Sequence, residues 1–164
     1  MVLFRIAHCM KRVHKSILLW YSPREMYELV VDIDRYPQFL PWCERAEVME
    51  QTADTMTARL HLSYAGVRQA FTTRNTHVPA RSVLVQLVDG PFSMLDGTWE
   101  FHPIGRAGAA TANGDESACR IEFELNYAFA SKPLEAVLSP VFDKVSDTLV
   151  DRFVQRAESV YGSR

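Results

Sequence analysis

The segment 67–78, VRQAFTTRNTHV, carries hydrogen-bonding side chains at alternate positions of a predicted β-strand. Successive side chains of a strand point to opposite faces. The residues therefore form two sets, which are Phe71, Thr73, Asn75 and His77 on one face and Thr72, Arg74 and Thr76 on the other. Whichever face points inward, this strand brings groups to the interior that can hold the polar atoms of a ligand. The alternative is an exposed edge strand, where these groups would meet only water.

The sequence contains no motif typical of a catalytic centre. The five histidines stand apart at positions 8, 14, 61, 77 and 102, and there is no H-E-x-x-H, phosphate-binding glycine loop or nucleophile elbow. His77 or His102 could act as an acid or base in a cavity, but an isolated strand histidine is more often structural. We therefore expect a protein that is not an enzyme, with no catalytic residue, no metal site and no covalently bound cofactor.

Composition and charge restrict the partners and the compartment. The net charge is −2 and the basic residues are spread along the chain, so we expect no DNA partner. Cys9, Cys43 and Cys119 are not at metal-ligand or disulfide-framework spacing, which fits a reducing cytoplasm. No window approaches the roughly 18 apolar residues of a membrane-spanning helix. We expect residues 1–10 to be an N-terminal extension that can be disordered, and residues 11–162 to be a single domain.

Two stretches have the pattern of a helix. Ser22, Pro23 and Glu25 form a capping box with proline in the first turn, and the apolar spacing that follows predicts a helix ending before Pro37. A second, long helix is predicted over about 132–161, with apolar residues along one face. Pro140 falls inside this long helix and should kink or divide it.

Most of the remaining sequence alternates with a period of two. Strands are predicted at about 12–21, 43–51, 56–64, 67–78, 82–89, 98–104 and 120–129, with a flexible hairpin loop at 105–118. Short links between consecutive strands imply an antiparallel meander. A sheet of about seven strands curls, and the long terminal helix is the element available to cover its concave face. We therefore predict an α+β fold, with two short helices between the first two strands.

Four segments carry a family resemblance: YSPREMYELVVDIDRYPQFLPWCE at 21–44, FTTRN at 71–75, DGPFSMLDGTWEF at 89–101 and VDRFVQRAESVYG at 150–162. In order and spacing they resemble the family that unites coenzyme Q-binding START-domain proteins with the bacterial ribosome-association toxin RatA. The resemblance covers nearly all of residues 13–162. It implies the helix-grip fold shared by START, Bet v 1-like and polyketide cyclase-like domains. For function it implies either quinone binding or interference with ribosomal subunit association.

The turn DIDRYPQFLPWCE at 32–44 is unusually aromatic. In a meander, alternate turns return to the same end of the sheet, so we expect YPQFLPW, YAG, GPFSML and ASKP to cluster. We interpret this end as the mouth of a cavity whose lid also contacts a membrane through residues 36–42 and 90–97. The lid residues would be Tyr36, Phe39, Leu40, Trp42, Phe92, Met94 and Leu95. The alternative is a plug that closes the end of the sheet.

An apolar channel is predicted between the sheet and the long helix. The strands would contribute Leu60, Leu62, Phe71, Trp99, Phe101, Phe123, Leu125 and Tyr127, and the helix Val141, Phe142, Val145 and Leu149. Thr73 and Asn75 would contact the polar head of a ligand. Arg156 lies within the apolar stripe of the helix, where a charge must be paired or reach solvent. We expect a structural ion pair with Glu28, Asp32 or Asp34, the alternative being contact with a ligand or ribosome.

These features lead to two functional hypotheses. In the first, the protein binds ubiquinone or a related isoprenoid lipid without catalysis and supports respiration from the cytoplasm, at the inner face of the membrane. In the second, a RatA-like toxin binds the large ribosomal subunit and blocks subunit association. A cyclase-like enzyme is a weaker alternative, because the fold alone does not decide function.

Overall fold

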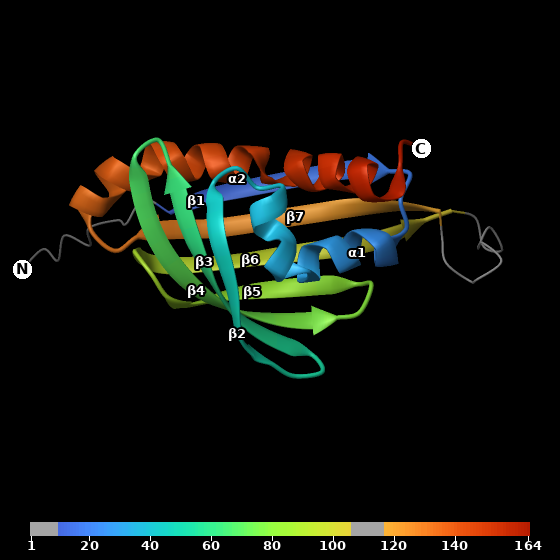
Figure 1. The fold of residues 1–164 in the computed structure, drawn as a ribbon, viewed down its shortest axis with the longest axis horizontal. Coiled ribbons are helices and arrows are strands. Elements are labelled where there is room, and N and C mark those ends of the chain that lie inside the picture. Colours follow the sequence, from blue (N-terminus) through green and yellow to red (C-terminus); the bar gives the residue numbers. More distant parts are fainter. Residues whose placement is uncertain (1–9, 106–116) are drawn as a thin grey trace, which may run out of the picture.

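The computed structural model describes residues 10–105 and 117–164, so the predictions for residues 1–9 and for most of the 105–118 loop lie outside the described residues. Figure 1 shows the elements in order. They are β1 (Lys11–Leu19), α1 (Pro23–Val31), the 3₁₀ helix η1 (Ile33–Gln38), β2 (Cys43–Gln51), β3 (Thr55–Tyr64), β4 (Val67–Val78), β5 (Ser82–Asp89), β6 (Phe92–Ile104), β7 (Ala118–Phe129) and α2 (Lys132–Tyr161). The α+β class and the two short helices between the first two strands are confirmed.

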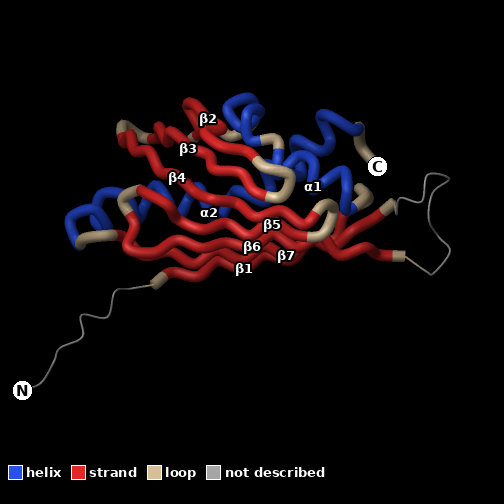
Figure 2. The backbone as a smooth tube through the Cα atoms, turned by 90° about the horizontal axis from the view of Figure 1, so that it is seen from below, coloured by secondary structure: helices blue, strands red, loops and turns tan. Residues whose placement is uncertain are grey.

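The described strands form one antiparallel sheet in the order β1-β7-β6-β5-β4-β3-β2. The sheet curves, and α2 lies along its concave face (Figures 1 and 2). Alternation along each strand sends apolar side chains toward α2 and polar ones outward, which is the physical origin of the period of two in the sequence. The helix-grip arrangement predicted from the resemblance is therefore present.

Strand β6 begins earlier than predicted, at Phe92 rather than near residue 98. Phe92 pairs with Phe129, but Met94 pairs with Ala128, so a register shift lies between the first two pairs. Such a bulge interrupts the alternation of side chains. The segment consequently looks like a turn in the sequence, and the prediction of a 90–97 loop was wrong for residues 92–97.

Helix α1 is fixed at its start by the predicted capping box. The Glu25 backbone N–H donates to the Ser22 hydroxyl over 3.0 Å, and the Ser22 N–H donates to the Glu25 carboxylate over 2.9 Å. The helix ends at Val31, and η1 follows at once. The Tyr36 hydroxyl of η1 donates to the Val30 carbonyl over 2.5 Å, which fastens the second helix to the end of the first.

Helix α2 runs without interruption from Lys132 to Tyr161, so Pro140 does not divide it. A proline removes the hydrogen bond to the carbonyl four residues earlier. Pro140 and Ala136 are both exposed, so water can replace that bond. The helix is therefore not divided at Pro140, whereas a kink there stays a prediction. The helix boundaries at 132–161 are confirmed.

A polar cluster fastens the first half of α2 to strands β1 and β7. Asp143 accepts hydrogen bonds from Lys11 Nζ and from the Tyr127 hydroxyl, each over 2.5 Å. Lys11 also bonds the Ser139 hydroxyl. The ring of Tyr127 is buried against the ring of Phe142. This cluster sets the position of α2 over the sheet, and with it the space between them.

Candidate functional site

A cavity of about 100 Å³ lies between the inner face of the sheet, helix η1 and helix α2. Its wall is composed mainly of aliphatic and aromatic side chains from all three. The lining residues are Ile33, Tyr36, Trp42, Ala58, Leu60, Phe71, Thr73, Asn75, Val85, Leu95, Gly97, Trp99, Phe123, Leu125, Phe142, Val145, Ser146, Leu149 and Phe153. The elements that position this wall are far apart in sequence, and the curvature of the sheet brings them together (Figure 2).

The lining contains no Asp, Glu, His, Lys or Arg. Its polar side chains apart from the rings are Thr73, Asn75 and Ser146. The Ser146 hydroxyl donates to the Asp143 carbonyl over 3.1 Å, so its proton is already used. The Tyr36 hydroxyl donates to Val30, and burial raises its pKa. The cavity is therefore a neutral, apolar space with a small polar region on β4.

Strand β4 places Thr73 and Asn75 on the inner face, which decides between the two faces left open by the sequence. Thr73 pairs with Ala58 and Asn75 with Met56 on β3, and both partners are buried. β4 is an interior strand flanked by β3 and β5, so the exposed-edge alternative does not apply. The Thr73 hydroxyl donates to Asn75 Oδ1 over 3.1 Å.

Small residues create the open space. Ala58 and Gly97 occupy inward positions of β3 and β6, where the other inward residues are larger. A Cβ added at Gly97 would lie 3.3 Å from Leu125 Cδ1 and 3.4 Å from the Glu124 carbonyl oxygen, so even a methyl group would crowd strand β7. Without these two residues the facing apolar layers would meet, as they do in an ordinary core.

Thirteen of the twenty-one predicted cavity and lid residues line this cavity. They are Tyr36, Trp42, Leu60, Phe71, Thr73, Asn75, Leu95, Trp99, Phe123, Leu125, Phe142, Val145 and Leu149. The other eight lie elsewhere in or around the core and are Phe39, Leu40, Leu62, Phe92, Met94, Phe101, Tyr127 and Val141. Among these, Leu62, Phe92 and Val141 line a smaller hollow of about 10 Å³ toward the start of α2.

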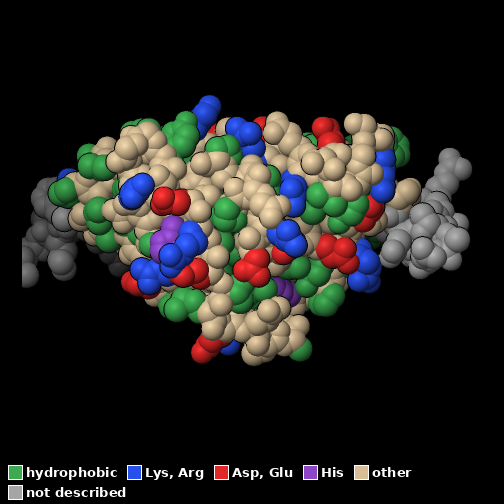
Figure 3. Space-filling view, in the orientation of Figure 1, with side chains coloured by type: hydrophobic (Ala, Val, Ile, Leu, Met, Phe, Trp, Pro, Cys, Tyr) green, Lys and Arg blue, Asp and Glu red, His purple; other side chains and the backbone are tan. Residues whose placement is uncertain are grey.

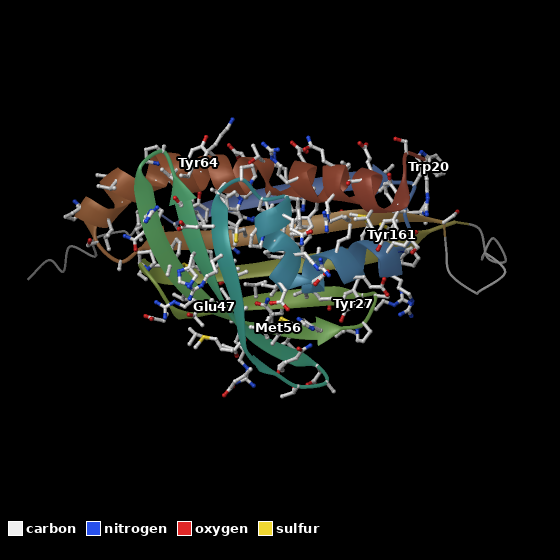
Figure 4. The ribbon with its side chains drawn as sticks, in the orientation of Figure 1. Trp20, Tyr27, Glu47, Met56, Tyr64 and Tyr161 are labelled. Atoms are coloured by element: carbon white, nitrogen blue, oxygen red, sulfur yellow. The ribbon has the colours of Figure 1, made fainter. Side chains whose placement is uncertain are left out.

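The predicted lid residues pack at two different positions along helix α2. Tyr36 and Phe39 pack on Phe153, with ring centroids 5.5 and 5.1 Å away, whereas Phe92 packs on Phe142 at 4.9 Å. Phe142 and Phe153 are roughly 16 Å apart along the helix axis, at 1.5 Å per residue. Figure 4 shows the β3–β4 turn, with Tyr64, near one end of α2 and Tyr161 at the other. Tyr36 and Phe39 therefore lie away from Phe92 along the helix. Trp42 stays beside the YAG turn, because its carbonyl accepts the Ser63 N–H over 2.8 Å.

The aromatic side chains of the 36–42 turn point inward. Tyr36, Leu40 and Trp42 are buried, and Phe39 is half-buried. Among the described residues, the most exposed large apolar side chains are instead Leu18 and Trp20, at 68% and 69% exposure. In this conformation the turn thus closes the cavity as a plug, and its aromatic groups are not displayed for membrane contact.

Arg156 does not form the predicted ion pair with an acid of the first helix region. Its guanidinium donates to Gln38 Oε1 over 3.1 Å and lies 5.1 Å from the centroid of the Phe39 ring. Among the ion pairs of the described residues, none joins Arg156 to Glu28, Asp32 or Asp34. The charge instead stays half-exposed, and its guanidinium face rests on an aromatic ring, which is a favourable contact.

Three lining residues were absent from the predicted channel although the sequence carries a signal for them. Ala58 and Val85 occupy alternate positions of predicted strands, and Phe153 belongs to the apolar stripe of α2. Gly97 falls in the predicted 90–97 loop, so no inward position was predicted for it. Ile33 and Ser146 lacked such a signal, because their orientation depends on how η1 and α2 meet the sheet.

The buried cysteines are unsuited to nucleophilic chemistry. Burial raises the pKa of the Cys43 thiol to about 11 and that of Cys119 to about 12. Both therefore remain protonated at neutral pH, whereas the thiolate is the reactive form. No cluster of His, Cys, Asp or Glu suited to a metal ion exists within residues 10–105 and 117–164.

Comparison with known proteins identifies the family. The family model described as "Polyketide cyclase / dehydrase and lipid transport" matches residues 19–154, which is most of the chain. The chain belongs to this family. The resemblance drawn from the sequence motifs is confirmed. Within the described residues no helix is long and apolar enough to cross a membrane.

Two of the named relatives differ in the function that their names state. The "Ribosome association toxin RatA" of Pseudomonas aeruginosa is 39% identical over 150 residues, covering 92% of this chain and 97% of the relative. The mitochondrial "Coenzyme Q-binding protein COQ10 homolog B" of Xenopus laevis is 27% identical, covering 90% of this chain and 58% of the relative. A solved aromatase/cyclase from Streptomyces sp. R1128 has a TM-score of 0.71 at 18% identity, covering 91% of this chain and 94% of its own, and shows the fold alone.

Proposed function

We propose that this protein binds a hydrophobic small molecule in the grip cavity and does not transform it. The observation that carries the proposal is the lining of the cavity, which is apolar, free of ionic groups and interrupted by one polar region on β4. The finer form of the proposal is an isoprenoid lipid such as ubiquinone, in line with the coenzyme Q-binding name of one relative. The protein would then act in the cytoplasm, beside the inner membrane.

The size of the cavity limits how such a ligand is held. About 100 Å³ is less than the roughly 300–1,000 Å³ of typical small-molecule sites. A quinone head group with its tail would need the plug formed by η1 and the 36–42 turn to move outward. Tail burial would supply the driving force, at about 0.8 kcal/mol for each CH₂ removed from water.

Catalysis is not part of this proposal, since Tyr36 is the sole lining residue with an ionisable side chain. Its hydroxyl is engaged with the Val30 carbonyl, and its raised pKa disfavours proton release. A cyclase needs groups that move protons at the substrate. The likeness to the Streptomyces aromatase/cyclase shows the fold alone, and we propose no cyclase activity from it.

The direct test is to purify the protein from its native host, extract bound lipid and analyse the extract by mass spectrometry. We expect an isoprenoid or another neutral lipid in amounts comparable to the protein. A protein purified in parallel from the same cells by the same steps is the control for carried-over membrane lipid. An extract with no enriched lipid, together with no binding of added ubiquinone analogue, would overturn the proposal.

A second candidate function is association with the large ribosomal subunit, in which the protein would block subunit joining. It is favoured by the 39% identity to RatA across more than nine tenths of both chains. Lys and Arg are interspersed with Asp and Glu over the face that carries β2–β4 (Figure 3). Arg45 pairs with Glu47 and Arg68 lies 3.5 Å from Glu44, so this face offers no continuous basic field for RNA.

A polysome profile tests this second function. Overproduction should raise free 30S and 50S subunits at the expense of 70S particles, and the protein should sediment with 50S. A profile that matches that of the empty vector would remove the hypothesis. The two functions are compatible, because the cavity is internal and a ribosome contact would use the outer surface.

A further inference from the structure

Asn75 presents the cavity with a hydrogen-bond donor that has no partner among the described residues. Its side chain is 7% exposed and lies on the inner face of β4. Its Oδ1 accepts the Thr73 hydroxyl over 3.1 Å, whereas Nδ2 donates to no acceptor among the described residues. A buried amide group without a partner destabilises a protein, so such groups are uncommon and call for a reason.

The amide nitrogen of Asn75 borders the cavity. The side-chain polar atoms of the described residues that are fully enclosed and without a partner are Trp42 Nε1, Arg59 Nε and His77 Nε2. Asn75 Nδ2 is not among them, so it touches open space. Because Asn75 lines the cavity and its strand neighbours Met56 and Val85 flank it on both sides, that open space is the cavity.

The rest of the lining determines what this donor can bind. It offers no cation to pair with a carboxylate or phosphate and no anion to pair with an amine. A charged ligand group would lose its hydration there without compensation, which is strongly unfavourable. A plain hydrocarbon would leave the Asn75 amide without an acceptor. The ligand that satisfies both conditions is uncharged and carries an oxygen acceptor on an apolar body.

We propose that Asn75 is a specificity-determining residue that donates to a carbonyl or ether oxygen of a neutral, otherwise apolar ligand. Thr73 acts as a positioning residue, because its hydroxyl holds Oδ1 and so directs the amide N–H groups into the cavity. This inference rests on the proposed binding of a hydrophobic molecule and deepens it by naming the ligand class. It selects neutral ketones, quinones and ethers over carboxylic acids such as free fatty acids.

Three probes with the same number of carbon atoms test the selection. Heptylbenzene and heptanophenone differ by one CH₂ replaced with C=O, and 7-phenylheptanoate carries a carboxylate. Binding is followed by the fluorescence of Trp42 and Trp99, which line the cavity. The quantity measured is the ratio of the dissociation constants of heptanophenone and heptylbenzene, so that the different hydrophobicities of the probes cancel between protein variants.

Asn75→Leu should raise this ratio about fivefold, the contribution of one neutral hydrogen bond. The matched control is Asn126→Leu on the outer face of β7, where the amide bonds Asp96 and the cavity is untouched. That control should leave the ratio unchanged. If Asn75→Leu does not fold, Thr73→Val should move the ratio in the same direction by freeing the amide to turn. 7-Phenylheptanoate should not bind the wild-type protein at concentrations that saturate heptanophenone.

The outcomes separate the inference from the function on which it rests. Binding of heptylbenzene and heptanophenone with a ratio unchanged by Asn75→Leu or Thr73→Val would overturn the inference and leave the binding function in place. Binding of 7-phenylheptanoate as tight as that of heptanophenone would overturn the selection for neutral ligands. Absence of binding for all three probes would overturn the cavity function, and the inference with it.

Discussion

Filling the cavity should stabilise the protein and abolish ligand binding at the same time. Ala58 lies at the inner face of β3, is 1% exposed and lines the cavity. In Ala58→Leu, three additional carbon atoms enter this space. Each buried carbon contributes about 0.8 kcal/mol, and about 1 kcal/mol is offset by the lost rotamer freedom of leucine. The free energy of unfolding should therefore rise by about 1 kcal/mol.

The assay is thermal unfolding combined with the heptylbenzene titration. For a protein of this size a gain of about 1 kcal/mol corresponds to an increase in Tm of about 2–4 °C. The dissociation constant of heptylbenzene should rise at least about tenfold, because the same space is occupied. The matched control is Ala70→Leu on the outer face of the adjacent strand β4, which should change the affinity by less than about twofold.

The combination of readouts separates loss of binding from loss of fold. A destabilised Ala58→Leu protein that still binds heptylbenzene with wild-type affinity would refute the reasoning, since the ligand would then occupy another place. A destabilised protein that does not bind would show that the space at Ala58 is already filled. Weakened binding in the Ala70→Leu control would mean that the probe sits on the outer surface.

Three further predictions concern the elements that position the cavity. Phe153→Ala should destabilise the protein by about 3–5 kcal/mol in urea unfolding, because its ring is 1% exposed and packs on Tyr36 and Trp99; a loss below about 1 kcal/mol would contradict this packing. Hydrogen bonds from Lys11 and Tyr127 help to hold the pKa of Asp143 below its usual value. Its stabilising contribution is therefore present above the unfolded pKa of about 4 and is lost as the pH falls through the folded pKa. Asp143→Asn should flatten the dependence of the urea midpoint on pH in that acidic range, and an unchanged slope would argue against the cluster. Desolvation lowers the pKa of His77, so stability should fall as the pH drops below about 6.5, where the unfolded chain binds the proton first; His77→Gln should remove this part of the pH profile, and a profile identical to wild type would contradict it.

The regular parts of the fold were predictable because local patterns agree with the final structure. The capping box at Ser22, the alternation within 43–89 and the apolar stripe of 132–161 each act over a few residues, and each has the boundaries that the sequence indicates. The start of β6 was not predictable in this way. A bulge after Phe92 breaks the alternation, so a strand that begins there resembles a turn.

The cavity was harder to predict than the fold, because it depends on distances between elements. Thr73 and Asn75 were identified by type and spacing, yet their inward direction required the pairing of β4 with β3. The aromatic residues at 36–42 and 92–95 were predicted to lie together because both segments adjoin the same end of the sheet. The order of the strands does not indicate where along α2 each segment packs. Arg156 was predicted to pair with an acid because opposite charges are the partners that a sequence reveals. Its actual partners, the Gln38 amide and the Phe39 ring, are uncharged and therefore were not predicted.

The cavity and the free amide of Asn75 point to selection for binding, because each makes the empty protein less stable. An apolar cavity loses the dispersion contacts that close packing would supply, and an unpartnered buried amide typically costs about 1–3 kcal/mol. A larger residue at Ala58 and an apolar residue at Asn75 would reduce both penalties. A ligand that fills the cavity and accepts the hydrogen bond of the Asn75 amide compensates for both penalties. The protein with such a ligand bound should therefore be more stable than the empty protein.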